Sequence, residues 1–192
     1  MKHLPKILLA GSFALGLTVL AQAAVETYKI DPVHSSVGFS IRHFFSNVPG
    51  AFTKFGGTIV VDRDHLENST VEATIEVPSI DTRSNQRDTH LRSKDFFAVE
   101  KFPTITFKSK SWKKSGDDTF DITGDLTMHG VTKEVVLKTK LLGFGPGMNG
   151  AVLSGWEATT TLNRNDFGIT FFPKVLGDDV AVTIGVEADQ QK

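Results

Sequence analysis

The sequence predicts an all-β fold, a closed antiparallel barrel of about eight strands with one short helical insertion around residues 83–97. Apolar and polar residues alternate strictly in segments such as 35–44 and 69–77, and this pattern gives a strand two different faces. Turn residues separate these segments at hairpin spacing. Closure into a barrel also removes the exposed edges of such a sheet. A β-sandwich is the alternative architecture.

Four strands are expected before the insertion, at 26–31, 35–44, 51–62 and 69–77. The turn pair Asp31-Pro32 ends the first of them. We expect a second turn at Val48-Pro49-Gly50. We also expect a bulge or bend at Gly56-Gly57, because such glycines allow a barrel wall to curve.

Five strands are expected after the insertion, at 104–113, 119–128, 131–142, 151–162 and 180–187. Asp125 to Gly130 is expected to form a hairpin turn, in which Gly130 supplies an unusual backbone angle. A glycine-rich loop at 143–150 precedes the next strand. Beyond that strand, Arg164 and Asp166 are expected to pair with each other.

The first 23 residues have the pattern of a signal peptide. Two lysines precede an apolar run at 7–20 that is too short to span a bilayer comfortably, and a small-x-small cleavage pattern follows. We expect cleavage between Ala23 and Ala24, which leaves a single exported domain at 24–192. A retained N-terminal anchor is the alternative.

Composition excludes several classes of protein. The formal net charge is −1, without the concentrated basic field that a nucleic-acid partner requires. The chain contains no Cys, so the exported domain must be stabilised by core burial and closed backbone hydrogen bonding. Fifteen Phe against one Tyr and two Trp favour an apolar interior, because Phe needs no polar partner.

The sequence predicts neither a metal site nor a catalytic residue. Five histidines lack the close spacing of zinc ligands: His34, His43, His65, His90 and His129. His34-Ser35-Ser36 beside Asp31 offers a nucleophile and a base. The GxSxG motif is absent, however, and Ser is frequent in turns, so we interpret this segment as a turn.

The segment 81–103 is the best candidate for a polar site, because it interrupts the strands with a charge cluster. The cluster consists of Arg83, Arg87, Asp88, His90 and Arg92. Its arginines either bind a phosphate, a pyrophosphate or another polar head group, or form an Arg–Asp network that fixes the insertion to the barrel rim. The neighbouring Phe96, Phe97 and Phe102 either line a cavity mouth or cap the core.

Several motifs, in order along the chain, resemble the YceI-like family. They are Asp31-Pro32-Val33-His34-Ser35, Phe39-Ser40-Ile41-Arg42-His43, Ser79-Ile80-Asp81-Thr82-Arg83, Arg87-Asp88-Thr89-His90-Leu91-Arg92-Ser93, Phe102-Pro103, Gly124 to Thr132 and Arg164-Asn165-Asp166-Phe167-Gly168. Each motif alone is weak, but their order and spacing cover the whole chain after the leader.

The resemblance implies a lipocalin-like barrel in the periplasm that holds a long amphiphile in an elongated apolar cavity. The favoured ligands are isoprenoid lipids, either polyprenyl pyrophosphates or isoprenoid quinones, and no other cofactor is expected. Some relatives are associated with cytochrome b561-type membrane proteins, and a homodimer is a further possibility.

We therefore expect a non-enzymatic carrier of an isoprenoid lipid. The candidate apolar contacts are Val37, Phe39, Ile41, Phe52, Phe96, Phe97, Phe102, Phe107 and Phe167. The head-group candidates are Arg83, Arg87, His90 and Arg92. Three alternatives stay open: an enzyme acting on such a lipid through His34, His90 or Asp88; a quinone-delivering partner of a membrane cytochrome; and a solidly packed barrel without ligand.

Overall fold

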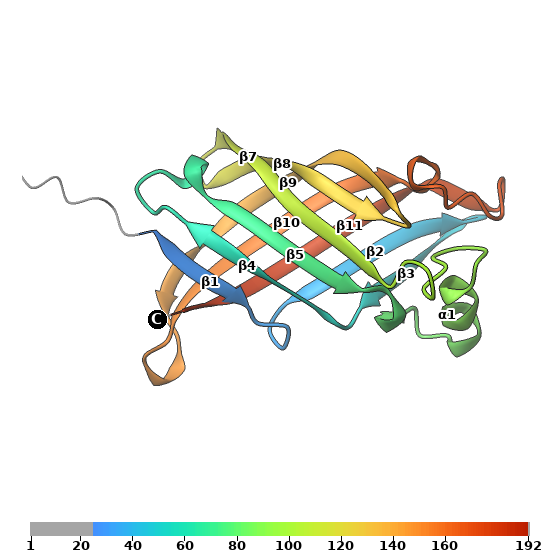
Figure 1. Cartoon of the computed structure of the whole chain (residues 1–192), viewed down its shortest axis with the longest axis horizontal. Coiled ribbons are helices and arrows are strands. Elements are labelled where there is room, and N and C mark those ends of the chain that lie inside the picture. The colour runs from blue at the N-terminus through green and yellow to red at the C-terminus, as the bar shows by residue number, and fades with distance from the viewer. Residues whose placement is uncertain (1–24, 192) are drawn as a thin grey trace, which may run out of the picture.

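The computed structural model describes residues 25–191, in which eleven strands form one antiparallel sheet (Figure 1). The strands are β1 (Glu26–Ile30), β2 (Ser36–His43), β3 (Ser46–Phe52), β4 (Phe55–Val61), β5 (Thr70–Glu76), β6 (Ile80–Asp81), β7 (Thr104–Gly116), β8 (Thr119–Met128), β9 (Val131–Pro146), β10 (Val152–Asn163) and β11 (Leu176–Gln190). The expected signal peptide, with its cleavage point between Ala23 and Ala24, lies outside the described residues. Within 25–191, no helix has the length and apolarity needed to cross a bilayer.

The sheet closes into a barrel because its first and last strands pair. The hydrogen-bonded order is β1-β4-β5-β7-β8-β9-β10-β11, and the pairing of β1 with β11 completes the ring. β11 pairs with β1 at Ala188–Gln190 and with β2 at 176–185, so β1 and β2 lie one after the other along it. β3 and β6 extend the same wall beyond β2. The prediction of an eight-stranded closed antiparallel barrel is confirmed.

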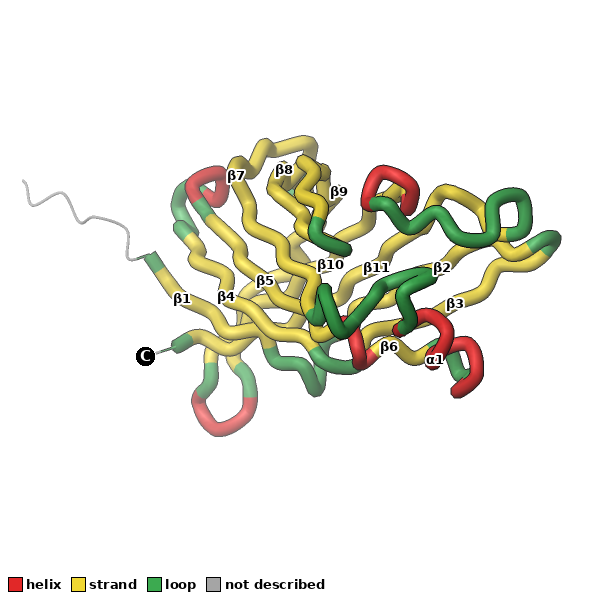
Figure 2. The backbone as a smooth tube through the Cα atoms, turned by 45° about the vertical axis from the view of Figure 1, so that its right-hand side comes forward, coloured by secondary structure: helices red, strands yellow, loops and turns green. Residues whose placement is uncertain are grey.

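The predicted insertion is also confirmed, as the helix α1 (Asn85–Arg92) between β6 and β7. Ser84 caps its N-terminus. Buried Asp88 accepts hydrogen bonds from the backbone N–H and the hydroxyl of Thr82, at 2.9 and 2.5 Å, and so fixes the helix to the end of β6. Figure 2 shows α1 beside β3 and β6 at one end of the barrel, which we call the α1 end.

Short 3₁₀ helices complete the described secondary structure: η1 (Leu66–Asn68), η2 (Val77–Ser79), η3 (Met148–Gly150) and η4 (Arg164–Phe167). The predicted glycine-rich loop at 143–150 is shorter than expected, because β9 continues to Pro146. The expected hairpin turn is confined to His129-Gly130, both with positive φ, whereas Asp125 lies inside β8.

The expected turn at Val48-Pro49-Gly50 is wrong. These residues lie within β3, and the chain turns instead at Phe44-Phe45, between the paired His43 and Ser46. Pro49 is tolerated there because β6 pairs only with Ala51 and Phe52, which leaves Pro49 on an unpaired edge.

The expected bulge at Gly56-Gly57 is also wrong. Both glycines pair with β5 in regular register, and the wall breaks earlier, between the end of β3 at Phe52 and the start of β4 at Phe55. A Cβ atom at Gly57 would clash with the carbonyl oxygen of Glu72 and lie 2.9 Å from the Cα of Ala73. Gly57 therefore permits close approach of two strands rather than a bulge.

Two apolar clusters occupy the interior. One surrounds Tyr28 and includes Trp112 and Trp156, whereas the other lies at the α1 end and includes Phe52, Phe96 and Phe167.

The Tyr28 hydroxyl donates to Glu26 at 2.5 Å and accepts from Arg63 at 2.6 Å. Burial raises the pKa of Tyr28 above its ordinary value.

We expect Gly57→Ala to destabilise the barrel, because the added methyl group would push against backbone atoms of β5 that cannot rotate away. Overpacking of this kind costs about 1–3 kcal/mol in free energy of unfolding. Gly56→Ala is the matched control, since a Cβ there has no neighbour within 4 Å. Urea denaturation checks the pair, and equal midpoints for the two variants would contradict this explanation of Gly57.

We also expect a pH-dependent contribution from the turn between β1 and β2. The His34 Nδ1 lies 2.6 Å from a carboxylate oxygen of Asp31, and this hydrogen bond raises the pKa of His34 and lowers the pKa of Asp31. The His34 contribution is complete below the ordinary His pKa of about 6.5 and is lost as the pH rises through the raised value. The Asp31 contribution is complete above about pH 4 and is lost as the pH falls through the lowered value.

The stability lost in His34→Gln should therefore be largest between about pH 4 and 6.5 and smaller at higher and lower pH. Unfolding by urea across this range measures it. His65→Gln, at another exposed His, is the control. A pH-independent difference between wild type and His34→Gln would rule out a role for the ion pair.

Candidate functional site

An elongated cavity of about 410 Å³ lies inside the barrel. Residues of ten strands and of α1 contribute to its wall, which is almost entirely apolar. The volume falls in the range of ordinary ligand pockets. The alternative of a solidly packed barrel is therefore wrong.

Seven of the nine apolar candidates line this cavity. They are Val37, Phe39, Ile41, Phe52, Phe96, Phe97 and Phe107. The first three alternate along β2, so strand periodicity places them on one inward face.

Phe102 and Phe167 lie outside the cavity lining and have packing roles. The ring of Phe102 packs on His129, with 4.8 Å between ring centroids, and covers Gly130, where a Cβ atom would clash with it. Phe167 is 2 % exposed, and its carbonyl oxygen lies 3.0 Å from His129 Nδ1. Both residues stabilise the β8–β9 turn against η4.

Other lining residues were missed by the sequence analysis. They include Trp112 of β7, Ile122, Leu126 and Met128 of β8, Trp156 of β10, and Val180, Val182, Ile184 and Val186 of β11. The available signal was the alternation of apolar residues in β8 and β11. The lining residues of these two strands occupy every second position, apart from Gly124 in β8. The inward parity of each strand could have been assigned from this pattern.

The cavity ends among aromatic rings on the side away from α1. Trp112 and Trp156 lie edge to face, with ring centroids 5.4 Å apart, and both are buried. Phe144 packs on Trp156 and on Tyr28 at 5.9 Å. Within the described residues, neither indole N–H has a hydrogen-bond acceptor. The lining at this end is accordingly apolar, and the guanidinium of Arg63, 4.3 Å from the centroid of the Phe144 ring, lies outside it.

The α1 end of the cavity is different, because Arg87 and His90 reach its lining together with Thr82. Arg87 donates from Nε to the Thr82 hydroxyl at 2.7 Å and from Nη2 to the Thr82 carbonyl at 2.6 Å. The same hydroxyl binds the Asp88 carboxylate. The observed network is thus Arg87–Thr82–Asp88, with Thr82 between the two charges, and it holds the guanidinium at the cavity rim.

His90 is held by aromatic rings and one carboxylate. Its Nε2 lies 3.1 Å from an oxygen of Asp95, and its ring meets the edges or faces of Phe96 at 5.0 Å and Phe171 at 5.3 Å. The imidazole is half-buried. These contacts fix the ring at the rim, where its other nitrogen can face a ligand.

Arg83 and Arg92 lie outside the cavity lining. Arg83 is exposed, has a φ of 62° and donates its backbone N–H to Asp81 at 2.7 Å. Arg92 donates to the carbonyls of Pro78 at 2.8 Å and Ile80 at 2.7 Å. Arg92 thus fixes the end of α1 to η2 and β6, which is a structural role.

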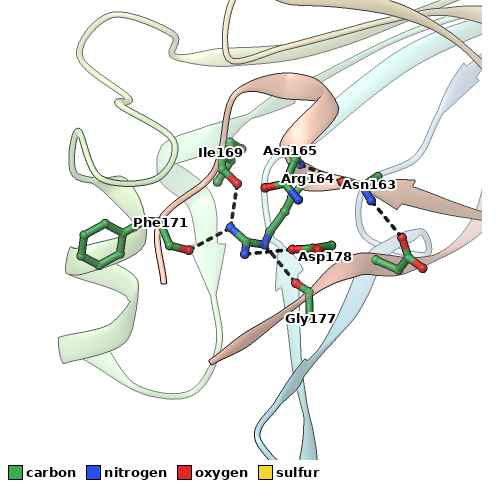
Figure 3. Close-up of polar contacts among 8 residues, drawn as sticks. Asn163, Arg164, Asn165, Ile169, Phe171, Gly177 and Asp178 are labelled. Atoms are coloured by element: carbon green, nitrogen blue, oxygen red, sulfur yellow. Dashed lines mark hydrogen bonds and ion pairs between the residues drawn. The ribbon is translucent and has the colours of Figure 1, made fainter. Parts of the chain in front are cut away.

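A buried arginine, Arg164, also reaches the cavity lining at the α1 end, where it organises the part of the rim formed by η4 and the loop after it (Figure 3). Arg164 is 3 % exposed and donates to the carbonyls of Ile169 at 2.7 Å, Phe171 at 2.8 Å and Gly177 at 2.9 Å. Its ion-pair partner is Asp178, at 3.2 Å. The expected pairing with Asp166 is therefore wrong, because η4 turns Arg164 inward and leaves Asp166 exposed. Arg164 holds the 168–176 loop in place beside α1.

The serine and histidine of the β1–β2 turn have structural contacts away from the cavity. The Ser35 hydroxyl donates to the carbonyl of Glu187 and accepts from its N–H, which fixes the turn to β11. Ligand atoms of Asp31, His34 and Glu187 lie within 4.8 Å of one another. His34 and Asp31 already hydrogen-bond to each other, and this contact agrees with the interpretation of the segment as a structural turn.

Comparison with known proteins matches both the sequence and the fold. A family model described as "YceI-like domain" matches residues 28–188. The chain is 42% identical to "Protein YceI" of Salmonella agona over 190 residues, which cover 97% of this chain and 99% of that protein.

Two solved structures share the barrel. BcnA of Burkholderia cenocepacia has a TM-score of 0.76 at 20% identity, with 82% of this chain and 98% of that chain covered. A polyisoprenoid binding domain from Saccharophagus degradans, implicated in plant cell wall breakdown, has a TM-score of 0.67 at 13% identity, with 85% and 98% covered. The family match over most of the barrel, together with the identity to Protein YceI, shows that this chain belongs to the YceI-like family.

Proposed function

We propose that the protein binds a long-chain isoprenoid lipid in its barrel and carries it through the periplasm. The observation that supports this proposal is the polarity of the cavity: its wall is apolar along its length, and charged side chains meet it at the α1 end. The YceI-like family is not a catalytic family, which agrees with the lack of a catalytic motif in the sequence.

An isoprenoid chain suits this cavity physically. Each CH₂-sized group taken from water contributes about 0.8 kcal/mol of transfer free energy, and an apolar wall supplies that burial without polar partners. The Saccharophagus degradans domain with the same fold is described as polyisoprenoid binding, which supports the same ligand class. We place the end of the hydrocarbon chain near Trp112 and Trp156.

The head group would then lie at the α1 end, next to Arg87 and His90. In the described part of the chain, the hydrogen bonds of Arg87 use Nε and Nη2, so Nη1 is available to a ligand. A guanidinium held in this way suits a pyrophosphate oxygen, and His90 can donate to a phosphate or to a quinone carbonyl. A homodimer and a cytochrome b561-type membrane partner stay predictions.

Protein purified from the periplasm should contain a stoichiometric isoprenoid lipid, identified by mass spectrometry of an organic extract. Ala73→Leu should reduce the amount, because Ala73 lines the cavity from the inward face of β5 and its larger side chain would take up cavity space. Thr74→Leu is the control, since Thr74 is the exposed neighbour on the outer face of β5 and lies outside the lining. Folded wild-type protein without any lipid would refute the proposed function.

Arg87→Gln should weaken binding of a polyprenyl pyrophosphate about tenfold or more, because a hydrogen bond to a charged group is worth roughly 1.5–3 kcal/mol. The fluorescence of Trp112 and Trp156, which both line the cavity, reports the titration. Arg83→Gln is the matched control outside the lining. Equal affinities of the two variants would place the head group elsewhere, and an unchanged affinity for a quinone in Arg87→Gln would separate the two ligand classes.

A further inference from the structure

Three exposed phenylalanines lie at the α1 end of the barrel. Phe45 is 103% exposed, Phe44 is 51% exposed and Phe172 is 45% exposed. The backbone N–H of Phe44 donates to the carbonyl of Val175 at 3.0 Å, so the β2–β3 turn touches the loop that carries Phe172. We call Phe44, Phe45 and Phe172 the aromatic tip. Figure 1 shows the β2–β3 turn at the same end of the barrel as α1.

The sequence of this turn opposes local conformational preference. A two-residue hairpin turn with positive φ at its first position favours Gly there, but this position holds Phe44 with a φ of 48°. Phe45 follows with no burial. Neither residue contributes the turn chemistry or the core packing that would explain it, and such local conflicts concentrate at functional sites.

The aromatic tip is continuous with the cavity. Phe172 is itself a lining residue, and so are His43 and Leu176, which flank the turn and the loop. His43 packs edge to face on Phe44, with ring centroids 4.8 Å apart. A surface that covered the tip would therefore also cover the polar end of the cavity.

Basic side chains accompany the tip. Arg42 donates from Nη1 to the carbonyl of Phe44 at 3.2 Å, and Lys174 follows Phe172 in the loop. Two acidic residues of this rim have polar partners, since Asp95 lies 3.1 Å from His90 and Asp178 forms an ion pair with Arg164, whereas Asp166 is exposed. Exposed aromatics beside Arg and Lys are typical of segments that enter the interface of an anionic bilayer.

We propose that the aromatic tip docks onto an anionic membrane surface with the α1 end of the cavity facing the bilayer. This inference deepens the proposed function and rests on it for the cargo, because a water-insoluble lipid must leave and enter a membrane. Docking by the tip places the cavity mouth against the interface, so the hydrocarbon chain need not cross open water. Membrane docking itself is measurable on protein of any loading state.

The experiment is sedimentation with mixed phosphatidylcholine–phosphatidylglycerol vesicles. Phe45→Asp should lower the partition coefficient for these vesicles about tenfold, because it replaces a ring that enters the interface with a charge that anionic lipid repels. Met148→Asp is the matched control, since Met148 is 84% exposed in the β9–β10 connection at the other end of the barrel. Its binding should equal that of wild type.

Two further measurements identify the surface. Phe45→Trp should show a blue-shifted emission with these vesicles, and this shift should shrink with pure phosphatidylcholine vesicles or with added salt. Sedimentation of each variant without vesicles reports its oligomeric state. Equal vesicle binding by Phe45→Asp and Met148→Asp would overturn the inference. So would a change in oligomeric state of Phe45→Asp with unchanged vesicle binding, since that result would make the tip an interface between two copies.

Cargo content separates the two proposals. If Phe45→Asp is purified with its lipid but does not bind vesicles, the aromatic tip is needed for membrane docking and not for lipid binding. Vesicle binding by a protein that never contains lipid would support docking and refute the carrier function. Wild-type protein that contains lipid but does not bind vesicles would support the carrier function and refute docking.

Discussion

The whole structure depends on β11, which provides one hydrogen-bonding edge for two successive strands. β10 pairs along one side of it, whereas β2 and then β1 share the other side. Because β2 and β1 follow each other along β11, the barrel wall on this side is longer than either of these two strands alone. This arrangement also explains why the interior is elongated, since a barrel of eight strands of this length encloses a space that is deeper than its side chains fill.

The distribution of polar groups follows from the same geometry. Where strands form the wall, their alternation directs apolar side chains inward. At the α1 end, however, β6 has two residues and β7 does not begin until Thr104, so a helix and its connections complete the wall. A helix does not have to alternate, and Arg87 and His90 can reach the lining from it. The same interruption leaves room for the loop that Arg164 holds by three carbonyl groups.

The sequence supported prediction of a closed barrel of about eight strands and of the helical insertion, because alternation and turn residues are local signals, but β3 and β6 were not predicted as strands. It misplaced the turn at Val48-Pro49-Gly50, since Pro and Gly normally mark turns and the real turn carries two phenylalanines. It could not separate Arg87 from Arg83 and Arg92, because the orientation of α1 against the barrel depends on buried Asp88 and its contacts with Thr82. Phe102 and Phe167 were likewise beyond reach, since an apolar ring has the same composition whether it faces a cavity or a turn.

Closure through β11 has a consequence for biogenesis. The contacts that complete the ring join Tyr28, Lys29 and Ile30 to Gln190, Asp189 and Ala188, so they link segments about 160 residues apart. Ring closure therefore waits for the synthesis of Ala188–Gln190, however early the hairpins between them form, and pairing across such a sequence separation is slow. A nascent chain in which β11 is missing therefore cannot close the native ring, whatever hairpins it has already formed.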